Sequence, residues 1–253
     1  MRNIDFLSKI AREKEIFTLD DVYKITGTNR EYLRKILYRL GKIGLIERIE
    51  RGKYMLIPLW GEKGKYTLHE FIIGSVIVSP YAISYWSALN YYGLTEQIPT
   101  TVFMQTTSWK KKQQMNIFGV KYKIVRVKKS KIFGIRKEWI EETQINITDK
   151  EKAIIDCLDK PQYCGGIIEV TKGLKNGKFN KDDLVKYAEK MSNSAILRRL
   201  GYLCDLLGIT ISIPEVNTRN YLYLDPTMPH KGEKNAKWRL IVNIDESVLG
   251  ELE

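Results

Sequence analysis

The chain has 253 residues, of which 43% are hydrophobic and 28% are charged. This composition is typical of a folded globular protein and excludes a disordered chain. The longest apolar run, at 71–78, is much shorter than the roughly 20 residues that a membrane-spanning helix needs. Because the N-terminus also has no signal-peptide pattern, we expect a cytoplasmic protein without a membrane partner.

The formal net charge of +12 is spread unevenly along the chain. Residues 1–60 have a net charge of +5, and residues 109–137 contain eleven Lys and Arg but no acid. Residues 138–253, in contrast, have a net charge of −3. Two separate basic regions indicate a polyanionic partner more than general solubility.

The first predicted elements are two short helices. Leu7 and Ile10 mark the first helix. Thr18 is suited to cap the second, and Asp20 and Asp21 fall in its first turn, where carboxylates complement the helix dipole. This helix is expected to end at Gly27 and to lead directly into a third helix.

The third helix is predicted to begin at Thr28. Thr28 and Glu31 match a capping box, so Thr28 is expected to be the N-cap. Apolar residues then recur at helical spacing and form one narrow stripe for burial. The residues of this stripe are Leu33, Ile36, Leu37, Leu40 and Ile43.

A β-hairpin is predicted after this helix, because apolar segments flank a basic turn that contains Gly52. Helices followed by a short hairpin with a basic tip predict a winged helix-turn-helix, which places its third helix in the major groove of DNA. The partner is then operator DNA, and the candidate contacts are Thr28, Asn29, Arg30, Arg34, Lys35, Tyr38, Lys42, Arg51 and Lys53. The alternative is a solvated basic helix in a winged-helix domain that binds protein.

A linker with Pro58, Gly61 and Gly64 follows the hairpin. We therefore predict a winged helix-turn-helix domain at 1–61 and a larger mixed α/β domain at 62–253, an α+β fold class overall. In the second domain the patterns predict helices at 68–78 and 80–93, and then four strand segments at 99–107, 115–127, 132–136 and 143–147. Four helices follow, from a capping box at Thr148 to Gly208, and strands at 221–225 and 238–244 close the chain.

Residues 109–137 are the strongest charge feature of the chain. A candidate second basic surface combines the loop after residue 107 with the outer side of the hairpin at 115–127, and consists of Lys110, Lys111, Lys112, Lys121, Lys123 and Arg126. One interpretation is a solvated sheet face, whose lysines discourage edge-to-edge pairing. The others are a further phosphate-contacting surface and a surface that holds RNA.

No motif for catalysis or metal binding is present. His69 and His230 have no metal-ligand spacing, and the absence of Asp-x-Asp removes the common two-metal signature of nucleotidyltransferases. Cys157, Cys164 and Cys204 contain no CxxC, so neither a zinc site nor a disulfide framework is expected, and Cys157 and Cys204 are interpreted as buried thiols. We therefore expect no enzyme activity, no cofactor and no bound metal.

Four segments behind the winged helix together resemble the AbiEi family of type IV antitoxins. They are 79–107, 147–166, 194–209 and 224–245, in the order that the family has. The resemblance rests on their sum, because no single motif is chemically distinctive. It implies a cytoplasmic repressor of its own toxin–antitoxin operon, which counters a nucleotidyltransferase toxin without forming a stable complex with it.

Charge and motif favour DNA binding, whereas only the resemblance favours the antitoxin role. The alternative function is a stand-alone winged-helix transcriptional regulator with a ligand- or partner-sensing C-terminal domain. An antitoxin that binds its toxin directly and an enzyme with a cryptic site are the other competing classes.

Overall fold

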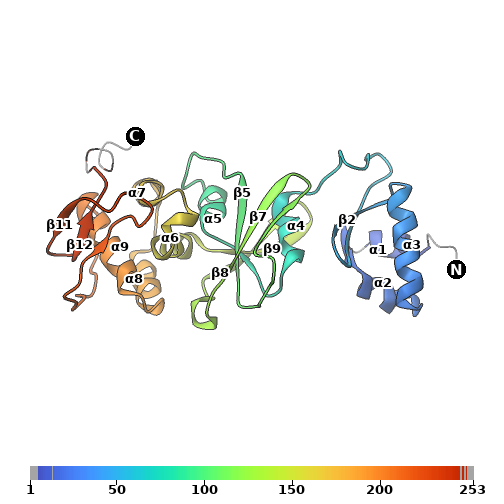
Figure 1. The fold of residues 1–253 in the computed structure, drawn as a ribbon, viewed down its shortest axis with the longest axis horizontal. Coiled ribbons are helices and arrows are strands. Elements are labelled where there is room, and N and C mark those ends of the chain that lie inside the picture. The colour runs from blue at the N-terminus through green and yellow to red at the C-terminus, as the bar shows by residue number, and fades with distance from the viewer. Residues whose placement is uncertain (1–4, 13, 246, 248, 250–253) are drawn as a thin grey trace. The chain divides into compact units, whose positions relative to one another are not determined.

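The computed structural model describes residues 5–12, 14–245, 247 and 249, and its elements follow in chain order in Figure 1. The fold class is α+β, with a winged helix-turn-helix followed by a larger mixed region, as the sequence predicts. Contacts divide the chain into two compact units, residues 1–79 with 116–120 and residues 80–115 with 121–253. The predicted boundary between residues 61 and 62 stays a prediction.

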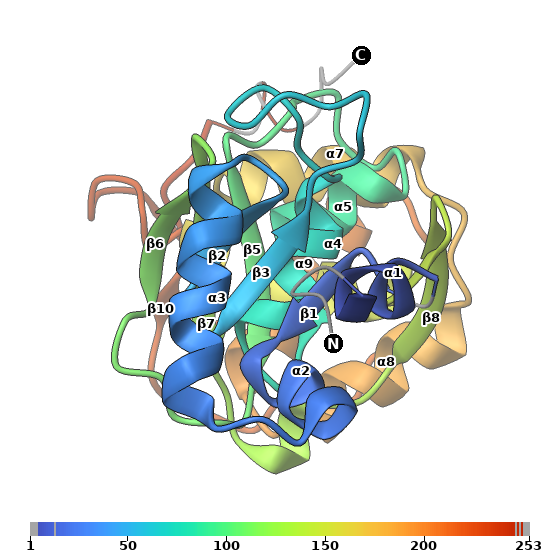
Figure 2. The same ribbon diagram turned by 90° about the vertical axis from the view of Figure 1, so that its right-hand side faces the viewer.

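The first unit contains the helix-turn-helix and its wing (Figure 2). Three strands form an antiparallel sheet in the order β1-β3-β2. The sequence did not predict β1, because three residues are too few to show an alternating pattern. The elements are α1 (Asp5–Ala11), β1 (Ile16–Thr18), α2 (Leu19–Thr26), α3 (Arg30–Lys42), β2 (Ile46–Glu50), β3 (Lys53–Leu56) and α4 (Glu70–Ile77).

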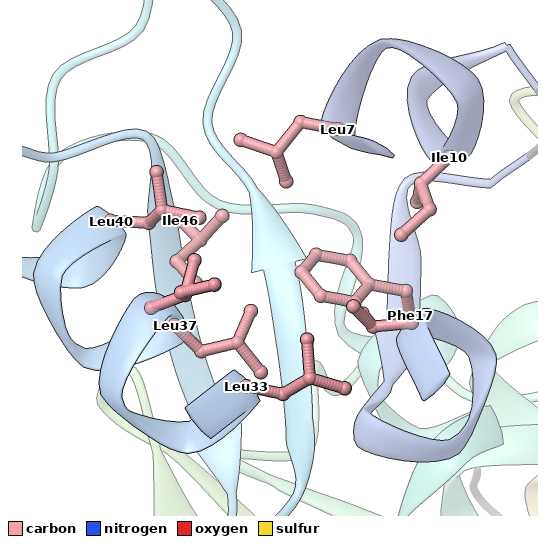
Figure 3. Close-up of a cluster of buried hydrophobic side chains, with 9 residues drawn as sticks. Leu7, Ile10, Phe17, Leu33, Leu37, Leu40 and Ile46 are labelled. Carbon is pink, nitrogen blue, oxygen red and sulfur yellow. The ribbon is translucent and has the colours of Figure 1, made fainter. Parts of the chain in front are cut away.

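The core of this unit is a cluster of nine buried apolar side chains between the helices and the sheet (Figure 3). Each of them stabilises the fold by about 1.5–3 kcal/mol if it is fully withdrawn from water. Four of the five residues of the predicted stripe on α3 are buried, but Ile43 is 67% exposed, so that part of the prediction is wrong. The helix ends at Lys42, so Ile43 is its C-cap and lies outside the helical stripe, and Gly44 with φ +80° turns the chain directly after it.

The cap of α2 is as predicted, whereas that of α3 is not. Thr18 Oγ1 accepts a hydrogen bond from Asp21 N, and the Asp21 carboxylate accepts one from Thr18 N at 2.7 Å. Partial burial alone would raise the pKa of Asp21, but the hydrogen bonds that its carboxylate accepts from Thr18 and Lys14 outweigh this effect and lower the pKa. The N-cap of α3 is Asn29, which accepts from the backbone of the second helical residue, while Thr28 lies in the turn behind Gly27.

The second unit is built on a six-stranded mixed sheet in the order β6-β7-β5-β4-β9-β8. Its strands are β4 (Ala82–Ile83), β5 (Thr101–Thr106), β6 (Gln114–Ile117), β7 (Val120–Arg126), β8 (Ile135–Ile140) and β9 (Thr143–Thr148). Strands β5 and β7 are parallel, as are β4 and β9. The carboxyl ends of β5 and β7 therefore lie at the same edge of the sheet.

Helices and a small second sheet complete this unit. The described helical elements are α5 (Trp86–Tyr91), η1 (Lys129–Lys131), α6 (Lys150–Asp159), η2 (Pro161–Tyr163), α7 (Ile167–Asn176), α8 (Lys181–Lys190) and α9 (Ser194–Leu206). The second sheet has the order β10-β12-β11 and consists of β10 (Leu222–Tyr223), β11 (Glu233–Asn235) and β12 (Leu240–Val242). The single helix predicted at 80–93 is wrong in its first half, because Ala82 and Ile83 pair with β5 as strand β4. Two boundaries also differ: Asp149, not Thr148, caps α6, and β8 begins at Ile135.

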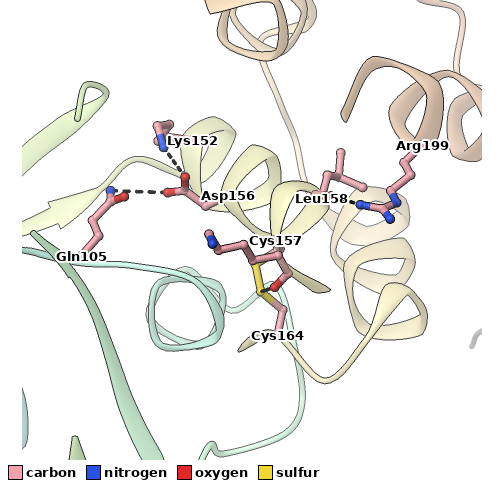
Figure 4. The surroundings of a disulfide bond; sticks show 8 residues. Gln105, Lys152, Asp156, Cys157, Leu158, Cys164 and Arg199 are labelled. Carbon is pink, nitrogen blue, oxygen red and sulfur yellow. Dashed lines mark hydrogen bonds and ion pairs between the residues drawn. A yellow bond between two sulfur atoms is a disulfide. The ribbon is translucent and has the colours of Figure 1, made fainter. Parts of the chain in front are cut away.

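Cations are buried deep in this unit, and each is satisfied by oxygen atoms of the chain. Lys152 forms an ion pair with Asp156 on the next turn of α6, and Gln105 donates to the same carboxylate at 3.4 Å (Figure 4). Burial outweighs the attraction of Lys152 and raises the pKa of Asp156 to about 6. Among the described residues, Arg198 and Arg199 on α9 each donate to three backbone carbonyls.

A disulfide joins Cys157 and Cys164, with their Cα atoms 5.7 Å apart (Figure 4). This corrects the sequence-based expectation of no disulfide and of a free thiol at Cys157. The pairing depends on η2, which turns the chain back after α6 and brings Cys164 beside the helix. The third cysteine, Cys204, is a buried free thiol as predicted, and burial raises its pKa to about 11.

Candidate nucleic-acid interface

Helix α3 separates its apolar and charged residues onto opposite faces. Because Leu33, Ile36, Leu37 and Leu40 are buried, the residues between them in the sequence must point outward. The outward residues Arg34, Lys35 and Tyr38 are all exposed, and the Tyr38 side chain reaches 66% exposure. The fold therefore gives this face no interior partner to pack against.

The charges of α3 are held only weakly within the chain. Arg30 pairs with Asp20 at 2.8 Å, and Lys35 pairs with Glu31 at 3.6 Å. All four of these side chains are more than half exposed, and exposed pairs of this kind contribute about 0–1 kcal/mol. Arg34 makes no side-chain hydrogen bond or ion pair with any residue in the described part of the chain. A phosphate or a base edge can therefore replace these internal contacts at little cost.

A groove of about 900 Å³ runs between α3 and the hairpin β2–β3. Its lining contains seven cations and a single carboxylate, which belongs to Asp20. An anionic partner would therefore meet a predominantly positive groove. The cationic residues of the lining are Arg30, Arg34, Lys42, Arg48, Arg51, Lys53 and Lys63.

The wing tip is a tight turn that presents Arg51. Gly52 has φ +80°, a conformation that glycine adopts without strain, and its carbonyl accepts a hydrogen bond from Leu19 N at 2.9 Å. This bond ties the tip to the start of α2. Arg51 is exposed and has no side-chain partner among the described residues, whereas Lys53 is half-buried and pairs with Glu50 at 2.6 Å.

The groove collects most of the predicted DNA-contacting residues. Six of the nine line it, while Lys35 lies on the outward face of α3 and Thr28 and Asn29 lie at the turn before that helix. Sequence reasoning missed two cations of the lining, Arg48 and Lys63. The alternation along β2 could not have found Arg48, because it shares the strand face of the buried Ile46 and the pairing register shifts between Arg48 and Glu50. Lys63 follows the wing, and its ammonium donates to the Gly41 carbonyl at the end of α3, a contact that no local pattern predicts.

The six residues of the second basic surface do not share one face. Lys123 is opposite Phe103 in the β5–β7 register and its ammonium lies 5.6 Å from the Tyr163 ring centroid. Arg126, three residues further along β7, points to the other side of the pleated sheet. Lys121 shares the side of Lys123. The three lysines Lys110, Lys111 and Lys112 instead follow β5 at the edge where β7 also ends.

Other kinds of site find little support in the described residues. Within 5–12, 14–245, 247 and 249, no group of three or more His, Cys, Asp and Glu could hold a metal ion. Across the same residues, no helix has the length and apolar character needed to span a bilayer. The predicted lack of a cofactor stays a prediction.

Helix-turn-helix, cationic groove and basic wing define a unit of the type that transcriptional regulators use to hold DNA. Residues 5–57 match the family model described as "Transcriptional regulator, AbiEi antitoxin". This N-terminal segment is therefore similar to the regulator domains of that family. The match confirms the resemblance, although the four segments that suggested it lie in the rest of the chain.

One solved structure with the same fold is that of the RV2827C protein from Mycobacterium tuberculosis. Its alignment has a TM-score of 0.66 and 13% sequence identity, and it covers 98% of this chain and 94% of that chain. At this identity the likeness concerns the fold alone. A search of curated proteins gave no significant match.

Proposed function

We propose that this chain is a DNA-binding repressor of its own operon and an antitoxin against a nucleotidyltransferase toxin. The observation that carries the DNA-binding part is the outward face of α3, which is cationic, exposed and continuous with a groove lined by seven cations. The match of residues 5–57 to AbiEi antitoxin regulators supports the rest of the proposal.

Each part of the interface has its own role in this proposal. Arg34, Lys35 and Tyr38 lie mid-helix and contact base edges in the major groove, where an arginine can bind a guanine through two hydrogen bonds. Asn29 and Arg30 at the helix start contact phosphate or the first base. The wing residues Arg51 and Lys53 hold the backbone of the same duplex, and such contacts position the protein without reading sequence.

The test uses the full chain and DNA from upstream of its own gene. A mobility shift with random DNA as competitor should show a preference of at least about 10³-fold for the upstream fragment. The double substitution Arg34→Glu with Tyr38→Ala should abolish this preference. The control Lys65→Glu makes the same charge change on an exposed lysine outside the groove lining and should leave the preference intact. Equal binding of both DNAs by the unsubstituted chain would contradict sequence reading.

The antitoxin role has a separate test. Co-expression of the chain with a nucleotidyltransferase toxin of this class should restore growth, and the toxin should not co-purify with the chain. Co-purification at equal stoichiometry would favour a direct toxin binder instead. We further propose a cytoplasmic chain without a catalytic site, so incubation with nucleotides and tRNA in the presence of divalent metals should leave both substrates unchanged.

A further inference from the structure

The loop between β5 and β6 presents an exposed tryptophan beside a run of lysines. Trp109 is 70% exposed. This is unusual, because the burial of an indole ring is among the largest contributions that a side chain makes to the free energy of folding. It is followed directly by Lys110, Lys111 and Lys112. Lys111 and Lys112 are exposed and make no ion pair with any residue in the described part of the chain.

The sheet topology gathers further cations at the same edge. In the parallel register Thr106 at the end of β5 is opposite Arg126 at the end of β7. Gln113 accepts a hydrogen bond from Ile124 N at 2.8 Å, which places the end of the loop on the far side of β7. The loop therefore crosses the carboxyl end of β7, close to Arg126. The exposed Lys128 and Lys129 leave β7 at this edge as well.

We propose that this edge binds single-stranded nucleic acid, with an unpaired base stacked on Trp109 and the flanking phosphates on the loop lysines and Arg126. Proteins that hold single strands combine an aromatic platform with cations that follow the backbone. A duplex cannot use the platform, because its bases are already stacked inside. A lipid surface fits less well, since binding there scales with buried apolar area and the loop neighbours of Trp109 are polar.

Trp139 provides a matched control within the same sheet. Its side chain is 65% exposed, and it lies on β8, at the opposite edge of the strand order from β6. Its chain neighbours include Glu138, Glu141 and Glu142. The Trp139 ring is therefore about as exposed as that of Trp109, but it lies among acidic as well as basic residues. A difference between the two tryptophans therefore reports the environment at Trp109 and not indole exposure in general.

Binding of the full chain to labelled oligouridine, oligodeoxythymidine and a duplex of equal length can be measured by fluorescence anisotropy. Trp109→Ala should weaken both single strands by about 5- to 150-fold, the loss of one stacked base, and should leave the duplex unchanged. Trp109→Phe should restore most of the affinity, and Trp139→Ala should have no effect. The ratio of the two single-strand affinities identifies RNA or DNA as the source of the ligand.

Salt dependence tests the phosphate contacts independently. The double substitution Lys111→Ser with Lys112→Ser should flatten the slope of log K against log salt on a single strand by about 1.4, or 0.7 for each phosphate. Three outcomes would overturn the proposal: an unchanged single-strand affinity for Trp109→Ala, an equal loss on the duplex, or binding of anionic phosphatidylserine vesicles without binding of either single strand. Because α3 is untouched in these variants, this test can fail while operator binding persists.

Discussion

The positive charges inside the second unit and those on α3 and the wing show two different uses of the same residue types. Lys152, Arg198 and Arg199 are buried, and oxygen atoms of the chain satisfy each of them. Arg34 and Arg51 are exposed, and neither has a side-chain partner among the described residues. The comparison indicates that loss of an interior cation or its partner costs stability, whereas loss of a surface cation costs binding.

The largest effect is expected when an interior cation loses its counter-ion. Asp156→Ala leaves the Lys152 ammonium buried without a carboxylate and should lower the free energy of unfolding by about 3–5 kcal/mol at pH 7. Chemical denaturation measures this difference. The double substitution Lys152→Met with Asp156→Leu removes both charges and should recover most of the loss. If the single and double variants were equally unstable, the charge would not be the cause.

A second effect is a pH dependence that arises from the same carboxyl group. Because burial raises the pKa of Asp156 to about 6, the unfolded chain releases this proton at a lower pH than the folded chain does. The contribution of Asp156 to stability is therefore full below about pH 4 and declines as the pH rises towards 6. The difference in unfolding free energy between the unsubstituted chain and Asp156→Asn, followed from pH 4 to 7, should show this decline. A difference that rises with pH would contradict the direction of the shift.

On the surface, Arg34→Ala should weaken operator binding by about 1–3 kcal/mol and relax specificity at one base pair. Its unfolding free energy should change by no more than about 0.5 kcal/mol, since the side chain contacts no described partner. Dissociation constants for operator variants that differ by a single base pair identify the base pair that Arg34 contacts. Arg34→Lys is the sharper control, because lysine keeps the charge but cannot form the two parallel hydrogen bonds. A loss that is equal on operator and random DNA would make Arg34 a phosphate contact.

The smallest effect is expected at Lys35. If Lys35 contacts phosphate instead of a base, Lys35→Ser should flatten the salt slope on duplex DNA by about 0.9 and weaken every sequence alike. The lost pair with Glu31 should contribute less than about 0.5 kcal/mol to stability, because both side chains are exposed. Titrations at four salt concentrations measure the slope. A changed base preference would instead support the proposed base contact.

Local patterns predicted the parts of the interface that depend on local chemistry. The helical period located the buried stripe of α3, and glycine in a basic turn located the wing. The period could not show that Ile43 lies beyond the helix end, because the helix ends one residue earlier, in front of the turn at Gly44. Lys63 in the groove was missed because its position depends on a contact with the Gly41 carbonyl.

In the second unit, most strands and helices were predicted from alternation, period and caps, but contacts between distant residues were not. Strand β4 has only two residues, and it exists because β5 and β9 pair with it. The bond between Gln105 and Asp156 joins residues 51 positions apart. The spread of the second basic surface over two sides of the sheet follows from the pleat, since Arg126 is an odd number of residues from Lys121 and Lys123.

The cross-link between Cys157 and Cys164 has a consequence for how the chain responds to its surroundings. Both cysteines are fully buried, and thiol–disulfide exchange requires an attacking thiolate to reach one of the sulfur atoms. A soluble reductant or oxidant therefore meets this pair only when the segment from α6 to η2 opens. It follows that the covalent state of the pair can change only as fast as this segment opens, so that local opening sets the rate at which the chain responds to its redox surroundings.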